Sequence, residues 1–148
     1  MIQIINQDLL ESKSKYIAHQ CNCVSKGSAG LAKLIFEKYP YSNSYFSRKN
    51  NSVPGTILIT GDGKEKRYII NMYSQFFPGK FGNLNDSEDD RLKYFNECLT
   101  KILIFADGDI AFPFGIGCGL AGGNWDNYYN LINNFSKKYN FDVFICKK

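Results

Sequence analysis

The sequence predicts an α/β fold in which helices cover both faces of a central sheet. Short apolar or β-branched segments alternate along the chain with segments whose apolar residues recur at helical spacing. Two predicted strands each open into a glycine-rich loop that leads into a helix. The chain has 148 residues, 44% hydrophobic and 22% charged, which is enough for one ordered domain with a buried core. We therefore expect residues 1–148 to form a single domain.

The first strand–loop–helix unit lies near the N-terminus. Three of the residues at positions 2–5 are isoleucine, which predicts a strand, and the polar turn after it places Asp8 at the end of that strand. A second strand, at residues 16–19, enters the first glycine loop, residues 22–30. A helix follows this loop and ends before Pro40. Its recurring apolar residues are Leu31, Leu34 and Ile35.

The middle of the chain predicts two neighbouring strands, a loop and a helix. The strands are residues 56–60 and 68–70, joined by a glycine-containing turn. Residues 76–85 have no period, and we interpret them as a loop that covers one face as a lid. Ser87 and Asp90 have the spacing of a capping box. The apolar stripe of the helix that follows is Leu92, Phe95, Leu99 and Ile102.

The second strand–loop–helix unit contains five glycines in nine residues. The apolar strand at residues 110–114 opens into the second glycine loop, residues 115–123. Asn124 is positioned to cap the next helix, and residues 141–146 form the last strand. The apolar residues of the helix are Trp125, Tyr128, Ile132 and Phe135.

Composition and charge exclude several classes of function. The net charge of +4 is spread along the sequence, so a nucleic-acid partner is not expected, although a mild positive bias favours a small anion. Cys21 and Cys23 are separated by one residue and His19 is the only histidine, so zinc spacing is absent and we expect neither a metal nor a cofactor. An odd number of cysteines without a signal sequence favours an intracellular, cytoplasmic protein. No apolar run reaches the roughly 20 residues that span a membrane, and we expect a soluble monomer.

Both glycine loops run from the carboxyl end of a strand to the start of a helix. Backbone N–H groups and the helix dipole favour anions there, and ligand crevices of open α/β sheets lie at these strand ends. Two such loops can hold a diphosphate from both sides. For the first loop alone, a tight connection without a ligand is an equally good interpretation. Neither loop has the residues of a Walker motif or the spacing of a Rossmann dinucleotide fingerprint.

Three segments together resemble the macro domain family, in particular its branch that processes ADP-ribose 1''-phosphate. Residues 113–123, followed by Trp125, resemble the second phosphate loop of that branch. Residues 19–23, with residues 30–32, are similar to its first loop, and residues 70–72 with Gln75 match one of its strands. The resemblance implies a mixed central sheet sandwiched between helices, a three-layer α/β/α fold. It also implies ADP-ribose or ADP-ribose 1''-phosphate as the ligand.

The resemblance further implies which residues contact the ligand. Asp8 would accept a hydrogen bond from the adenine amino group, Asn22 would face the distal ribose, and the glycine loops would surround the phosphates. Without the family context, a turn or capping residue is the favoured interpretation of Asp8. The full set of implied ligand contacts is Asp8, Leu9, Asn22, Ser28, Ala29, Gly30, Leu31, Ala32, Asn71, Pro113, Gly115, Ile116, Gly117, Cys118, Gly119 and Leu120.

The sequence departs from the family at positions that bear on catalysis. Related hydrolases carry a lysine near Gln75 and an acidic residue near Ala121, and the most similar branch carries an aspartate at Asn124. His19 then becomes the candidate general acid or base, with Asn22 beside it as the other catalytic candidate. A buried strand histidine is the alternative for His19. Cys118 is read either as a nucleophile or as a small packing residue.

The leading hypothesis is a phosphatase that hydrolyses ADP-ribose 1''-phosphate to ADP-ribose and phosphate. Two alternatives stay open. One is a non-catalytic reader of ADP-ribosyl groups, which the missing lysine and carboxylates favour. The other is a glycohydrolase that removes ADP-ribose from an ADP-ribosylated macromolecule by activating water.

Overall fold

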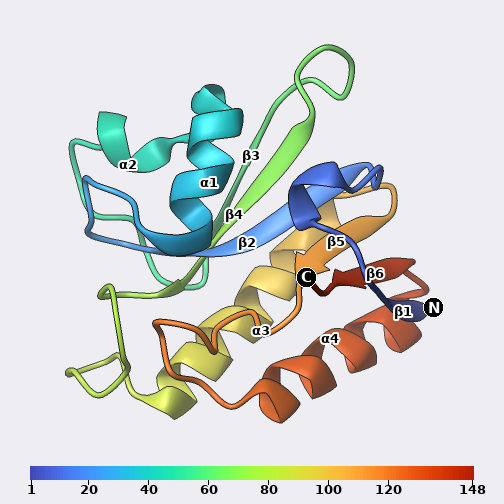
Figure 1. The fold of residues 1–148 in the computed structure, drawn as a ribbon. Coiled ribbons are helices and arrows are strands. Elements are labelled where there is room, and N and C mark those ends of the chain that lie inside the picture. Colours follow the sequence, from blue (N-terminus) through green and yellow to red (C-terminus); the bar gives the residue numbers. More distant parts are fainter.

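The central sheet has six strands in the order β1-β6-β5-β2-β4-β3. A computed structural model describes all of residues 1–148, shown in Figure 1. Only β3 runs antiparallel, to β4, and every other neighbouring pair is parallel. The sheet is therefore mixed, as predicted. The strands are β1 (Ile2–Ile5), β2 (Tyr16–Asn22), β3 (Ile57–Thr60), β4 (Tyr68–Gln75), β5 (Ile110–Pro113) and β6 (Val143–Cys146).

Helices lie on both faces of this sheet and complete the predicted three layers. In Figure 1, α1 and α2 cover one face, and α3 and α4 cover the other. Two short 3-10 helices, η1 and η2, follow β1 and α1. The bounds are η1 (Leu9–Glu11), α1 (Gly30–Lys38), η2 (Pro40–Ser42), α2 (Ser44–Ser47), α3 (Glu88–Phe105) and α4 (Trp125–Tyr139). No helix combines the length and the apolar character that crossing a bilayer requires.

The two faces of the sheet bury two separate hydrophobic cores. Along β2, Ala18 belongs to the 17-residue core under α3 and α4, whereas Ile17 belongs to the 11-residue core under α1. This alternation follows from the two-residue period of a strand. It decides which residues of β2 reach each side of the sheet, and that division shapes the site described below.

The predicted helix starts at residues 87 and 124 are confirmed. Ser87 Oγ accepts from the Asp90 backbone N–H at 3.0 Å, and the Asp90 carboxylate accepts from the Ser87 N–H at 3.1 Å, which completes the capping box. Asn124 caps α4 by accepting from the Asp126 N–H at 2.9 Å. Both helices therefore begin where their local sequence signals place them.

Several element predictions were wrong in extent. β2 continues to Asn22 and β4 to Gln75, beyond the predicted residues 16–19 and 68–70. The extra residues are largely polar, and they stay extended because the two strands pair along their whole length. Leu34, predicted on the buried stripe of α1, is 52% exposed, and Ile35 and Phe36 are buried instead. The short helices η1, η2 and α2 were not predicted.

Candidate ligand-binding site

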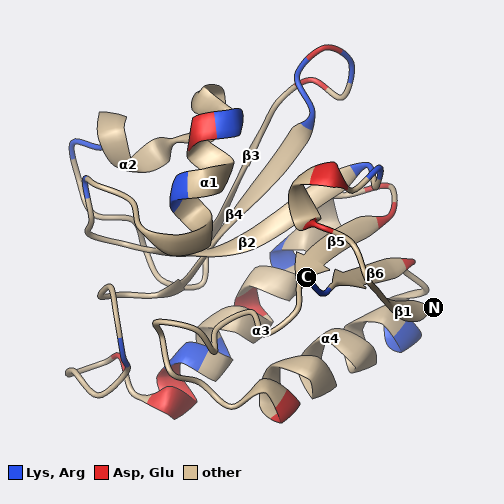
Figure 2. Ribbon diagram, in the orientation of Figure 1, with Lys and Arg blue, Asp and Glu red and all other residues tan.

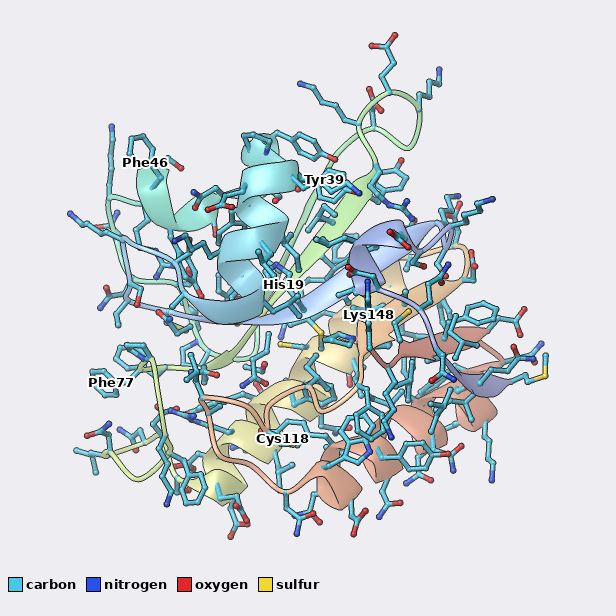
Figure 3. The ribbon with its side chains drawn as sticks, viewed as in Figure 1. His19, Tyr39, Phe46, Phe77, Cys118 and Lys148 are labelled. Atoms are coloured by element: carbon cyan, nitrogen blue, oxygen red, sulfur yellow. The ribbon has the colours of Figure 1, made fainter.

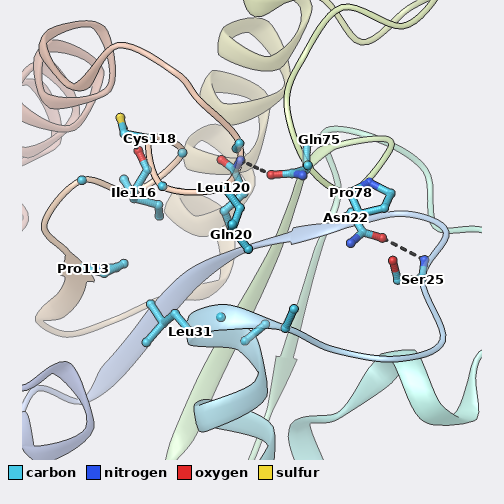
Figure 4. A pocket seen from close by; sticks show the side chains of 18 of the residues that line it. Gln20, Asn22, Ser25, Leu31, Gln75, Pro78, Pro113, Ile116, Cys118 and Leu120 are labelled. Atoms are coloured by element: carbon cyan, nitrogen blue, oxygen red, sulfur yellow. Dashed lines mark hydrogen bonds between the residues drawn. The ribbon is translucent and has the colours of Figure 1, made fainter.

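The two glycine loops line one cavity of about 410 Å³, a size typical of small-molecule sites. The first loop and the start of α1 contribute residues 22, 25, 27 and 29–32, and the second loop with the end of β5 contributes residues 113–121. Figure 4 shows the two loops facing each other across the cavity. None of the 21 lining residues is Asp, Glu, Lys, Arg or His. In Figure 2 the loop after β5 likewise carries no charged residue.

The second glycine loop offers free backbone donors to this cavity. Gly115 and Gly117 have φ of +76° and +79°, values that a side chain would disfavour. Inside the loop, the Cys118 N–H donates to the Gly115 carbonyl at 2.8 Å and the Gly123 N–H to the Gly117 carbonyl at 2.9 Å. The N–H groups of this loop that donate to no group of the chain are those of Gly115, Gly117, Gly119, Leu120 and Ala121. Free amide donors of this kind bind anions.

The N-terminus of α1 adds a second set of free donors on the opposite wall. Ala29 is the N-cap and its side chain makes no capping hydrogen bond, and Gly30 begins the helix at φ +58°. The N–H groups of the first helical turn have no partner within the helix, and the helix dipole makes this end positive. Ala29, Gly30, Leu31 and Ala32, four of the predicted ligand contacts, line the cavity. Ser28, which was predicted with them and precedes them in the chain, does not line it.

Asn22 is held rigidly and keeps one donor for the cavity. Its side-chain Oδ1 accepts from the backbone N–H groups of Val24 at 3.1 Å and Ser25 at 2.8 Å. The backbone N–H of Asn22 donates to Tyr45 Oη at 2.7 Å, and its backbone carbonyl accepts from Arg48 Nη2 at 3.1 Å. The Nδ2 group makes no hydrogen bond within the chain, and Figure 4 shows Asn22 at the cavity wall.

Two glutamine side chains line the cavity at one end, and neither of them, Gln20 or Gln75, was predicted as a ligand contact. Gln20 Nε2 donates to Gln75 Oε1 at 2.5 Å, and Ser74 Oγ donates to Gln20 Oε1 at 2.8 Å. Gln75 Nε2 donates in turn to the Phe77 carbonyl at 2.8 Å. The alternation of side chains along β2 could have predicted Gln20 in the cavity. Gln20 lies two residues from Asn22, whereas its neighbour His19 faces the other side of the sheet. Tyr45, Pro78 and Gly79 also line the cavity and were not predicted.

His19 does not face the cavity, which corrects the prediction that it is the general acid or base. Its side chain points to the α1 side of the sheet, where the ring meets Phe36 edge-on at 5.4 Å, and it is 1% exposed (Figure 3). Nε2 donates to Asn71 Oδ1 at 2.7 Å, since Asn71 Nδ2 donates to the Ser42 carbonyl at 2.8 Å. Burial lowers the pKa of His19 to about 4. The buried strand histidine is therefore the arrangement observed.

Because His19 is buried, we expect it to make the free energy of unfolding depend on pH. Between pH 6.5 and about 4, the unfolded chain protonates His19 while the folded chain keeps it neutral. The free energy of unfolding therefore falls as pH drops through this window, by about 3 kcal/mol in total. Denaturant unfolding measures the free energy of unfolding at each pH for the wild type and for His19→Gln, which keeps an amide donor. The difference between the two proteins should become constant above pH 7. Equal pH dependence in the two proteins would contradict the assignment.

Cys118 fits one of its two interpretations, the small packing residue, whereas Asn71 differs from its expected role. Burial raises the pKa of the half-buried Cys118 thiol to about 11, and its Sγ donates to the Ile116 carbonyl at 3.4 Å. The packing interpretation of Cys118 thus fits better than a nucleophile. Asn71 is fully buried and does not line the cavity, because both ends of its amide are used inside the protein. No group of three or more His, Cys, Asp and Glu side chains is arranged to hold a metal ion.

Asp8 lies in a second hollow, which shares no lining residue with the first cavity but contacts its wall. Its Oδ1 accepts from the Leu10 N–H at 3.0 Å and caps η1, and its Oδ2 lies 3.8 Å from Lys148 Nζ. Lys147 lines the same hollow, and its Nζ lies 4.6 Å from the centre of the Phe114 ring, which lines the main cavity. Leu9, by contrast, is a core residue only 4% exposed and lines neither space.

Similar proteins were found by sequence, although no protein-family model matches the chain. An ADP-ribose 1''-phosphate phosphatase of Lodderomyces elongisporus is 30% identical over 96 residues, 61% of this chain and 56% of that protein. An ADP-ribose 1''-phosphate phosphatase of Candida albicans is 23% identical over 163 residues, 98% of this chain and 99% of that protein.

Similar folds were found among solved structures. The macrodomain of Mycobacterium tuberculosis DarG has a TM-score of 0.77 at 17% identity, over 99% of this chain and 97% of that one. Thermosipho africanus DarTG in complex with ADP-ribose has a TM-score of 0.73 at 15% identity, over 99% of this chain and 41% of that one. With its mixed six-stranded sheet between two helical layers, the chain has the macro domain fold, and it is similar in sequence to two ADP-ribose 1''-phosphate phosphatases.

Proposed function

We propose that the cavity binds ADP-ribose, with the diphosphate between the two glycine loops. The observation that carries this proposal is that residues with unpaired backbone donors line both walls of a space without charged side chains. Such donors favour an anion, and no carboxylate in the wall repels it. The complex of the similar Thermosipho africanus protein with ADP-ribose supports the choice of ligand.

The two hollows give the proposed ligand a direction. The adenine would lie toward Asp8, where a carboxylate oxygen can accept from its amino group, and the phosphates would pass Phe114 to reach the loops. The distal ribose would then meet the free Nδ2 of Asn22 and the amides of Gln20 and Gln75. All of these side chains are neutral donors and acceptors, which suits ribose hydroxyls.

Calorimetric titration with ADP-ribose tests the proposal, with AMP and ribose 5-phosphate as partial ligands. We expect one site per chain and weaker binding of each fragment, since each reaches only one end of the site. Absence of heat with ADP-ribose, in protein that unfolds cooperatively, would overturn the proposal.

The second candidate function is hydrolysis of ADP-ribose 1''-phosphate to ADP-ribose and phosphate, which the names of the two fungal relatives support. With His19 outside the cavity, no side chain there serves as a general base. Water held by Asn22 Nδ2 or Gln75 would add to phosphorus as the bond to the 1'' oxygen breaks. A phosphate oxygen would take one proton of the water and pass it to the leaving 1'' oxygen, which gives ADP-ribose and phosphate. The free loop amides would stabilise the charge on the phosphate.

A phosphate-release assay in the same preparation separates the candidates. Release from ADP-ribose 1''-phosphate that falls in Asn22→Ala supports the phosphatase. Binding of ADP-ribose without release supports a reader of ADP-ribosyl groups. Release of free ADP-ribose from a modified macromolecule would instead support the glycohydrolase.

Replacement of Asp8 tests the direction of the ligand. Asp8→Ala should weaken ADP-ribose binding by roughly 1–3 kcal/mol, because the adenine amino group loses a charged acceptor. The change also removes the cap of η1, so Asp8→Ser, which keeps a capping oxygen but is too short to reach the base, is the matched variant. Calorimetry should show similar losses in both. Full affinity in Asp8→Ser would place the adenine elsewhere.

A further inference from the structure

Arg91 is a fully buried cation behind the cavity, and neither the sequence analysis nor the proposed function uses it. Its side chain is 1% exposed and lies at the start of α3. We propose that Arg91 is a positioning residue that joins the loop of residues 76–86 to the second glycine loop and thereby sets the shape of the cavity. The proposal rests on the proposed function, because it assigns Arg91 to the binding of ADP-ribose.

The guanidinium donates to both of these segments at once. Nη1 donates to the Gly79 carbonyl at 2.8 Å and to the Ala121 carbonyl at 3.4 Å. Nη2 donates to the Phe77 carbonyl at 3.1 Å. Gly79 and Ala121 both line the cavity, one from each loop. A planar group with several fixed donors suits such a bridge, since it holds each carbonyl in a defined direction.

Arg91 also connects to the polar end of the cavity. The Phe77 carbonyl that accepts from Arg91 Nη2 also accepts from Gln75 Nε2 at 2.8 Å, and Gln75 Oε1 accepts from Gln20 Nε2. An unbroken chain of hydrogen bonds thus runs from Arg91 to the two amides that face the ligand space. Loss of the guanidinium would free the carbonyl that orients the Gln75 amide.

The counterion of Arg91 is Asp86, which is equally buried. Nη2 lies 2.8 Å from Asp86 Oδ2, and the carboxylate also accepts from the N–H groups of Phe76 at 2.8 Å and Phe77 at 2.9 Å. Burial acts to raise the pKa of Asp86, but the hydrogen bonds from Arg91, Phe76 and Phe77 hold it below its usual value. The pair therefore remains ionised and ties the loop to α3.

The position of this pair argues that helix formation alone does not explain it. Asp86 directly precedes the N-cap, Ser87, and Arg91 is the fourth residue of α3. These are the positions where two hydrophobic residues usually form a staple. A cation near a helix N-terminus is unfavourable, and a buried ion pair is often no more stable than an apolar pair. What the guanidinium adds over an apolar staple is its hold on the carbonyls of two cavity walls.

The experiment compares Arg91→Met and Arg91→Lys with a control on the same helix, Ile102→Ala. Ile102 is fully buried at the far end of α3, so its truncation destabilises the fold without touching the cavity. Hydrogen exchange of residues 76–86 and 115–123 in the free protein is the first measurement. Affinity for ADP-ribose, at a temperature where every variant is folded, is the second.

We expect Arg91→Met to speed exchange in both loops and to weaken ADP-ribose binding by roughly tenfold or more, because misplaced donors bind poorly. Arg91→Lys keeps the charge beside Asp86, but one ammonium cannot reach both walls. The affinity of this variant for ADP-ribose should therefore lie between those of the wild type and Arg91→Met. Ile102→Ala should retain the wild-type affinity for ADP-ribose and the wild-type rates of hydrogen exchange in both loops. If Arg91→Met does not fold, Arg91→Lys against Ile102→Ala decides.

Two results would overturn the inference. One is unchanged exchange in either loop, which would mean that Arg91 does not join them. The other is faster exchange with wild-type affinity, which would make the residue structural only. If the wild type itself does not bind ADP-ribose, the proposed function fails, and the exchange data alone still decide whether Arg91 joins the loops.

Discussion

Gly119→Glu is expected to weaken ADP-ribose binding by about 100-fold or more, with little change in stability. Gly119 lies in the cavity wall, and its N–H is one of the free donors of the second glycine loop. A Cβ added there meets no atom within 4 Å, and the residue does not require a positive φ. The side chain is therefore accommodated, and its carboxylate would stand where the proposed diphosphate lies. Like charges in such contact cost several kcal/mol.

Gly119→Gln is the matched control, since it has nearly the same size without the charge. Calorimetry should show a smaller loss for the glutamine variant than for the glutamate variant, while both unfold at the wild-type temperature. Equal affinity of Gly119→Glu and the wild type would mean that no anion occupies this wall of the cavity.

Gly117→Ala is expected to destabilise the fold by about 2–4 kcal/mol. Gly117 has φ +79°, and an added Cβ would lie 2.5 Å from the ring of Tyr128. That ring cannot move aside easily, because it is 1% exposed and packs edge-on against Phe95 with the ring centres 5.0 Å apart. Backbone strain and overpacking thus act together at this position.

Gly119→Ala, two residues away in the same loop, should be close to neutral because it has neither problem. Denaturant unfolding of both variants measures the difference, with an unchanged m-value as the check that the two-state comparison holds. Similar stability of the two alanine variants would show that the loop moves away from Tyr128, and would weaken the argument that this ring fixes the shape of the loop.

The parts of the fold that could be predicted from sequence are those with local signals. The capping box at Ser87 and the N-cap at Asn124 depend on residues three positions apart or fewer, and both are confirmed. The ends of β2 and β4 have no such signal. Gln20, Asn22 and Asn71 are polar residues inside strands, and only the pairing of two strands distant in sequence keeps them extended.

The candidate site could be predicted in its backbone but not in its side chains. Dense glycine marks a loop whose main chain approaches a ligand, so the second glycine loop was found directly. Whether a strand residue faces the cavity depends on which face each helix covers, and this placed Gln20 in the cavity and His19 outside it. Arg91 had an available signal, because residues 91, 95, 98, 99 and 102 repeat at helical spacing and are all buried.

The absence of charged side chains from the cavity has a consequence for selectivity. Lysine or arginine would attract any polyanion over a distance of about a Debye length, whatever its shape. Amide dipoles act only at contact and only along the N–H direction, so an anion gains little until its oxygens meet several of them together. With ADP-ribose bound as proposed, the cavity would discriminate between ligands by the spacing of their oxygen atoms rather than by their total charge.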